Sequence, residues 1–266
     1  MQINENILAQ MCSLAYREPA ELSDTVFERF EGFQGFQRSG AEAVVAHDNQ
    51  TVVVVVRGTQ RNLLDLMYDL QFLCPVKQAT GFVHRGFRRF ADRLGDTGLW
   101  DHITGLQPRT LWFAGHSLGG AAASILAGDA IERGFTCPIN VFSIGQPRTG
   151  TRRWASRLEW LLVMSGGRID RYVHPLDVVP HLPPYGKRFL PEYRHFGDTR
   201  MIRSDGTMLL NATIQESVLL TAMAAFKSPH GVCRAHNTAL YVKDFQTWAR
   251  HRKRNSLSMH IEHETR

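Results

Sequence analysis

LWFAGHSLGGAAAS, residues 111–124, contains the features that decide the fold. Its first residues are apolar and predict the end of a buried strand, and its small last residues predict a helix from Ala121 to Ala130. Between them, GHSLG at 115–119 fits the pattern G-x-S-x-G, in which a serine lies on a strained strand-to-helix turn with its hydroxyl projecting. An ordinary glycine-rich loop would have the same letters, so the rest of the chain must supply a base, an acid and an oxyanion hole for Ser117.

The composition is ordinary for a globular protein, with 43% hydrophobic and 21% charged residues among 266. A chain of this length predicts a single α/β domain over residues 1–266. No apolar run reaches about 18 residues, so no membrane span is predicted. The N-terminus lacks a basic start followed by an apolar stretch. We therefore expect no secretory signal, and either a cytoplasmic protein or one exported by a leaderless route.

The net charge of +6 favours anionic partners. The basic residues form no nucleic-acid module, so we expect no nucleic acid and consider an anionic lipid surface instead. The four cysteines are widely spaced, and no metal-ligand, P-loop or dinucleotide motif occurs. We therefore predict neither a metal nor a cofactor.

Strand and helix patterns alternate along the chain, which predicts a largely parallel sheet with helices on both faces, the α/β class. Besides the strand and helix around Ser117, we predict strands at 41–46, 51–56, 139–144 and 169–173, and helices at 5–16, 85–94 and 238–250. The residues at 47–50 predict the turn between the first two strands. The charged tail, 251–266, is expected to be poorly ordered.

The acid and the base of an α/β-hydrolase follow the serine in that order. Asp177 lies just beyond the carboxyl end of the strand at 169–173, whereas Asp170 lies at its start, so we predict Asp177 as the acid. His236, directly before the last helix, is the preferred base. His230 is its rival, and a purely structural histidine is the alternative for both.

The oxyanion hole needs two backbone N–H groups. One belongs to the residue after the nucleophile, Leu118. The other would come from the end of the valine-rich strand, where Gly58 permits close backbone approach and Thr59 offers an N–H and a hydroxyl. Taken alone, this second motif would equally fit a plain strand-ending turn.

Five motifs together resemble the class 3 lipases in their order: RGT at 57–59, VHRGF at 83–87, GHSLGG at 115–120, GQPRTG at 145–150 and DVVPHLPP at 177–184. The resemblance implies an α/β-hydrolase fold with Ser117 as nucleophile, Asp177 as acid, and Thr59 and Leu118 as oxyanion donors. It also implies that Asp69 supports the oxyanion residue. The chain departs from the family where Ala235 stands in place of a frequent aspartate before the histidine.

Two further segments carry apolar residues at helical spacing. In the first, at 60–70, these residues are Leu63, Leu64, Met67 and Leu70. Class 3 lipases carry a lid at this place, and an amphipathic surface helix is the alternative. The second, at 211–226, predicts either a packed core helix or a flap that contacts lipid, within a region, 194–232, that matches no family motif.

These features together predict a serine carboxylester hydrolase, a lipase that cleaves acylglycerol esters through an acyl-enzyme at a lipid–water interface. A phospholipase A acting on membranes is the rival that the basic charge favours. A catalytically inactive lipid-binding protein is a rival of a different class. The intact Ser117, Asp177 and Thr59 argue against it.

Overall fold

A mixed sheet of eight strands runs through the residues that the computed structural model describes, which are 3–22, 25–58, 75–78, 81–183, 191–210 and 235–264, with the backbone alone for 253–264. Five central strands are parallel, and the edge strands are antiparallel to their neighbours. In spatial order the strands are β1 (Gly32–Arg38), β2 (Ala41–His47), β3 (Thr51–Val56), β6 (Thr110–His116), β7 (Ile139–Ile144), β9 (Ile169–Val173), β11 (Thr199–Ile202) and β12 (Met208–Leu210).

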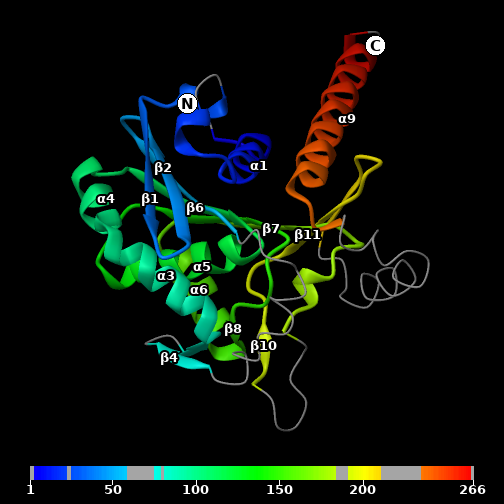
Figure 1. Cartoon of the computed structure of the whole chain (residues 1–266). Coiled ribbons are helices and arrows are strands. Elements are labelled where there is room, and N and C mark those ends of the chain that lie inside the picture. Colours follow the sequence, from blue (N-terminus) through cyan, green and yellow to red (C-terminus); the bar gives the residue numbers. More distant parts are fainter. Residues whose placement is uncertain are drawn as a thin grey trace.

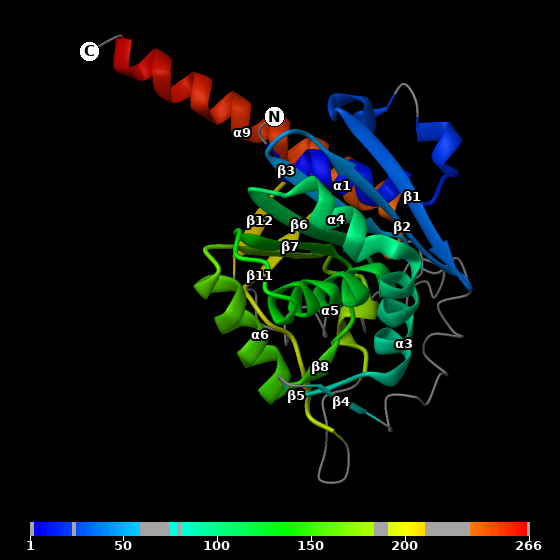
Figure 2. The same cartoon turned by 90° about the vertical axis from the view of Figure 1, so that its left-hand side faces the viewer.

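Helices cover both faces of the sheet, as the sequence predicts (Figure 2). One face carries α3 (Arg85–Leu94), α4 (Trp100–Leu106), α5 (Leu118–Glu132) and α6 (Arg152–Met164). The other face carries α1 (Glu5–Leu14) and α9 (Thr238–Glu264), which pack against each other. The remaining helical turns are short, at Pro19–Leu22, Val26–Arg29, Gly95–Leu99 and Val179–His181.

The core has two layers, one on each face of the sheet. All six residues of β3 are buried because helices cover both of its faces, which explains its unbroken run of β-branched residues. Toward α5 the strands pack on small side chains such as Ala121 and Ala122. Toward α1 and α9 they pack on larger ones, including Met11, Tyr241 and Phe245. The layer with α1 and α9 therefore ties both helices to the middle of the sheet.

The predicted hairpin between β2 and β3 is confirmed, with the two strands antiparallel. The Asp48 carboxylate accepts hydrogen bonds from the backbone N–H groups of Gln50 and Thr51, at 2.9 and 2.7 Å, and so closes the turn. A second, four-stranded sheet, which the sequence analysis does not predict, packs against α6. Its strands are β10 (Tyr193–Arg194), β8 (Gly150–Thr151), β5 (Gly81–Val83) and β4 (Val76–Gln78).

The last helix is longer than the sequence analysis predicted. We placed its end near Arg250, but α9 continues to Glu264 and extends away from the sheet (Figure 1). The predicted end is wrong because no proline or glycine occurs between residues 238 and 264 to stop the helix. Among the helices of the described residues, none combines the length and apolar content that crossing a bilayer requires.

Candidate active site

Ser117 lies on a single-residue junction between β6 and α5. Its backbone has φ 58° and ψ −130°, a conformation that costs a non-glycine residue energy and that occurs at functional turns. The Ser117 N–H donates to the carbonyl of Ile144 on the neighbouring strand, at 3.0 Å. The sheet thus holds the strained turn from the side, and the strained serine predicted from G-x-S-x-G is present.

The glycine that closes the motif is required by packing. A Cβ on Gly119 would lie 2.2 Å from the carbonyl oxygen of Val56, at the end of β3. The start of α5 therefore lies directly against the end of the valine-rich strand. Leu118 is the first residue of α5, so its N–H has no acceptor within the helix. This N–H lies next to Ser117, at the positive end of the helix dipole.

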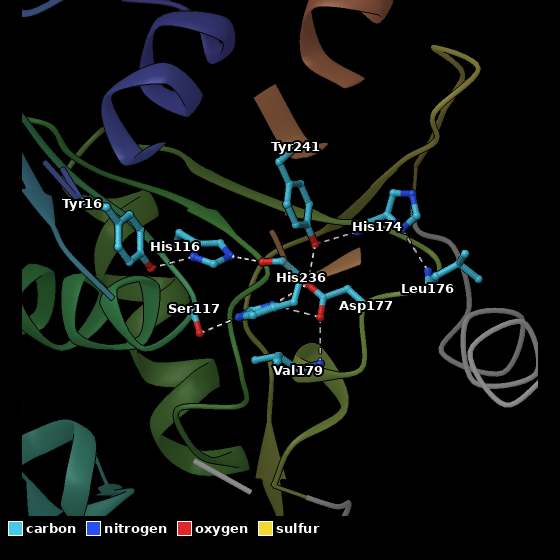
Figure 3. A network of polar contacts seen from close by, with 9 residues as sticks. All are labelled: Tyr16, His116, Ser117, His174, Leu176, Asp177, Val179, His236 and Tyr241. Carbon is cyan, nitrogen blue, oxygen red and sulfur yellow. Dashed lines mark hydrogen bonds and ion pairs between the residues drawn. The ribbon is translucent and has the colours of Figure 1, made fainter. Parts of the chain in front are cut away.

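His236 connects Ser117 to Asp177 (Figure 3). Its Nδ1 lies 3.0 and 2.9 Å from the two carboxylate oxygens of Asp177, and its Nε2 lies 2.7 Å from Ser117 Oγ. A carboxylate can only accept, so Nδ1 carries the proton and Nε2 is free to accept from the serine hydroxyl. This is the tautomer that a general base for Ser117 needs.

Asp177 is fully buried, and each of its oxygens is held by neighbours other than His236. Oδ1 accepts from the backbone N–H of Val179 at 2.9 Å, and Oδ2 accepts from the hydroxyl of Tyr241 at 2.8 Å. The Tyr241 hydroxyl itself accepts a hydrogen bond from the backbone N–H of His174 at 2.8 Å. Burial, and then the nearby Asp177 charge, raise the pKa of Tyr241 well above its ordinary value, so Tyr241 stays a neutral donor.

The three elements that carry these side chains meet at the carboxyl ends of the parallel strands. Ser117 follows β6, Asp177 lies in the loop after β9, and His236 comes just before α9. The structure therefore brings together the predicted nucleophile, acid and base, with Leu118 beside them. Asp170, the rejected acid, pairs instead with Arg168 and Arg200, at 2.8 and 2.9 Å.

Several predicted site residues lie outside the described residues, so the structure does not place them. They are the oxyanion residue Thr59, its support Asp69, the lid candidates Leu63, Leu64 and Met67, the rival base His230, and the helix predicted at 211–226. Gly58, which precedes Thr59, is described. Its close approach to other backbone is evident, because a Cβ there would lie 2.7 Å from the carbonyl oxygen of His116.

Three residues near the triad were missed by the sequence analysis or given no role there. Tyr241 donates to the acid, His116 contacts the base, and Tyr16 contacts His116. The motif GHSLG contains His116, but its letters do not say where that side chain points. Tyr16 lies 100 residues before His116, and no local pattern links the two. Within the described residues, no group of three or more histidine, cysteine or acidic side chains could hold a metal ion.

Comparison with protein families matches residues 53–187 to "Lipase (class 3)". Among curated relatives, a lipase of Rhizopus oryzae is 30% identical over 55% of this chain and 38% of its own length. A secreted mono- and diacylglycerol lipase of Fusarium solani is 31% identical over 59% and 48%, and a phospholipase A1 of rice is 28% identical over 60% and 47%. The chain thus matches less than half of the length of each of these relatives.

The solved structures show the same architecture. The native propeptide complex of the Rhizomucor miehei lipase superposes with a TM-score of 0.62 at 23% identity, over 81% of this chain and 75% of the other. At this identity the likeness establishes the fold, and the predicted α/β-hydrolase fold is confirmed. The family match ends at residue 187, so His236 and Tyr241 lie beyond it.

Proposed function

Because the chain belongs to the class 3 lipase family, we propose that it is a serine carboxylester hydrolase that cleaves acylglycerol esters. The single observation that carries the proposal is the continuous hydrogen-bonded series from Ser117 through His236 to Asp177. Its order along the chain is serine, acid, histidine, the order of α/β-hydrolases. The lipase relatives support an ester of glycerol as the substrate.

In the proposed reaction, Ser117 Oγ attacks the ester carbonyl carbon while His236 Nε2 takes the serine proton. Asp177 keeps its negative charge and stabilises the imidazolium through Nδ1–H. The ester C–O bond then breaks, and the imidazolium gives its proton to the leaving alcohol. Water attacks the acyl-enzyme with His236 again as base, which releases the fatty acid and restores Ser117.

The negative oxygen of each tetrahedral intermediate needs donors. We assign one to the Leu118 N–H at the start of α5 and the other to Thr59, with Asp69 as its support. Thr59 and Asp69 are assigned from the family motif at 57–59 and from the sequence position of Asp69. Leu63, Leu64 and Met67 stay predicted lid residues on the same ground. A sharp rise in activity where ester droplets appear, lost in the triple Leu63→Ser, Leu64→Ser, Met67→Ser variant, would support that part of the proposal.

A phospholipase A is the second candidate, since a phospholipase A1 is among the relatives and the net charge of +6 favours anionic lipid surfaces. Both candidates place the protein at a lipid–water interface, in peripheral contact. Measured rates on triglyceride emulsion, on phospholipid vesicles and on soluble p-nitrophenyl esters separate them. The geometry of Ser117 and His236 supports either enzyme over an inactive lipid binder.

The deciding experiment is labelling by an alkyl phosphonate, which reacts with an activated serine. We expect one label per chain on Ser117, loss of ester hydrolysis in step with labelling, and neither labelling nor hydrolysis in Ser117→Ala. Loss of the nucleophile costs about a millionfold in another serine hydrolase. Ser124→Ala is the matched control, because Ser124 is a buried serine on α5, the helix that follows Ser117, and its hydroxyl donates to the Gly120 carbonyl. Wild-type protein that is folded but is not labelled would refute the proposal.

A further inference from the structure

A chain of hydrogen bonds enters the site from the side opposite to Asp177. The Tyr16 hydroxyl lies 2.8 Å from His116 Nδ1, and His116 Nε2 lies 2.8 Å from the backbone carbonyl of His236 (Figure 3). These bonds connect the turn after α1 to the backbone of the base itself.

The direction of these bonds is fixed by what each group can do. The carbonyl of His236 only accepts, so His116 Nε2 must carry a proton. In a neutral ring Nδ1 then has a free lone pair, and the Tyr16 hydroxyl donates to it. Burial, and then the neighbouring His236, hold the pKa of His116 well below its ordinary value, so the neutral ring is the stable form. The His236 carbonyl thus selects the tautomer of His116, and Tyr16 donates to the nitrogen that this tautomer leaves free.

The two imidazole rings also touch. The centroids of the His116 and His236 rings are 4.4 Å apart at an interplanar angle of 35°. His116 is buried, with 5% of its surface exposed, and Tyr16 lies edge-on against its other side at 5.9 Å. His236 is therefore held by His116 at two places, its carbonyl and its ring. A neutral neighbour matters here, because a second cation would repel the imidazolium that forms on His236 during attack.

We propose that Tyr16 and His116 are positioning residues for the hydrolysis, which hold the His236 ring in line with Ser117 by fixing the His236 backbone. The inference rests on the proposed function. Asp177 and Tyr241 orient His236 through Nδ1, and Tyr16 and His116 hold it through its carbonyl. The Tyr16 hydroxyl also lies close to Gly58, which stands directly before Thr59 in the sequence, because a Cβ on Gly58 would lie 2.3 Å from that oxygen.

Tyr16 lies outside the segment that matches the family, and it comes from the turn that follows α1. Its ring also carries the Arg57 guanidinium at 5.9 Å from the centroid, and Arg57 pairs with Glu42 on β2. The ring of Tyr16 therefore has a contact of its own with the end of β3, independent of its hydroxyl. Removal of that hydroxyl alone leaves the packing of the ring in place and isolates its effect on His116.

The kinetic experiment compares Tyr16→Phe with Tyr172→Phe. Tyr172 is a buried tyrosine of the core layer with α1 and α9, and its hydroxyl accepts from Arg200 at 3.0 Å, away from the triad. We expect Tyr16→Phe to lower kcat about fivefold with KM unchanged, since one hydrogen bond is worth about 1 kcal/mol. Tyr172→Phe should lower stability and leave kcat unchanged. Equal kcat in Tyr16→Phe and wild type would overturn the proposal.

Substitution of His116 tests the other half of the chain of bonds. His116→Gln keeps an N–H donor that can reach the His236 carbonyl, whereas His116→Leu leaves that buried carbonyl unpaired. We expect the glutamine variant to retain at least tenfold more kcat than the leucine variant. If both lose kcat equally while remaining folded, the bond to His236 does not position the base.

A spectroscopic readout separates this inference from the proposed function. Imidazole ¹⁵N spectra of wild-type protein should show the Nε2–H tautomer for His116, whatever the substrate of the enzyme. Tyr16→Phe should keep that tautomer but shift the Nδ1 resonance, because its hydrogen bond from Tyr16 is lost. An Nδ1–H tautomer in the wild type would overturn the inference by itself. A wild-type protein with the expected tautomer and no ester hydrolysis would refute the proposed function, and with it the positioning of a base for that reaction.

Discussion

Gly145 keeps open the space beside Asp177 that any other residue would fill. A Cβ on Gly145 would lie 2.8 Å from Asp177 Oδ2 and 3.1 Å from His236 Nδ1, between the acid and the base. The residue also has a φ of +59°, which glycine adopts without strain. The glycine that opens the motif GQPRTG is therefore a steric requirement of the triad.

Gly145→Ala should lower kcat about 10- to 100-fold, because the added methyl group pushes the imidazole away from Asp177 and misplaces it by a fraction of an ångström or more. Gly134→Ala is the matched control, since Gly134 has a φ of +86° and open space around it. Each substitution adds about 1–2 kcal/mol of backbone strain. Equal activity of the two variants in an ester assay would show that the space beside Asp177 is unimportant.

Tyr241→Phe should weaken both the fold and the reaction. It leaves the buried His174 N–H without its acceptor and removes one donor from Asp177. A buried polar group left unpaired costs about 1–3 kcal/mol, which denaturant unfolding would measure. We expect kcat to fall about tenfold with KM unchanged. Unfolding and kinetics that both match the wild type would contradict the roles we assign to this hydroxyl.

Asp244 should make stability depend on pH. It is buried on α9, with His174 Nε2 at 3.8 Å, and burial raises the pKa of its carboxyl from 3.8 to about 6. As pH rises, the Asp244 carboxyl ionises in the unfolded chain before it ionises in the folded one. The stability that Asp244 contributes is therefore fully present below pH 3.8 and is lost as pH rises through 6. The loss amounts to about 3 kcal/mol.

Asp244→Asn should therefore have a larger free energy of unfolding than the wild type at pH 8 and nearly the same one at pH 4. Asp205→Asn is a control of opposite sign, because hydrogen bonds from Thr207 lower the pKa of that exposed carboxyl. Its loss of stability should be seen at pH 8 and disappear in acid. If the Asp244 variant showed no gain at pH 8, ionisation of Asp244 would not oppose folding.

Thr59→Ala tests the proposed oxyanion hole. The substitution keeps the backbone N–H and removes only the hydroxyl. Removal of a whole oxyanion donor costs about 2.7–4 kcal/mol of transition-state stabilisation. The loss in Thr59→Ala should not exceed this value and should fall mainly on kcat. Thr110→Ala, at the opposite end of β6 from Ser117, should leave kcat unchanged. An effect of Thr59→Ala confined to KM would place Thr59 in substrate binding instead.

The sequence predicted those elements whose pattern is local. β3 is a run of valines, α5 begins with small residues, and the turn at Ser117 has its own motif, so their positions needed no knowledge of neighbours. β1 was missed because GFQGFQR at 32–38 contains two glycines and little regular alternation. α6 was missed although Trp154, Leu158 and Leu162 recur every four residues and are buried.

The triad itself could be proposed from order and position along the chain, but its supports could not. Tyr16, His116 and Tyr241 act through contacts that exist only after α1 and α9 have packed on the same face of the sheet. A tyrosine in a turn and a histidine at a strand end have no local signature of such a role. Long-range hydrogen bonds of this kind can be recognised only in the three-dimensional structure.

The packing of α9 against α1 has a consequence for how activity arises during protein synthesis. The ribosome makes Ser117 and Asp177 well before His236, which comes directly before α9, and α9 packs against α1. An incomplete chain that stops before residue 236 contains the proposed nucleophile but has no base for it. Such a fragment is therefore expected to be inactive, because the proposed reaction needs side chains from distant parts of the chain.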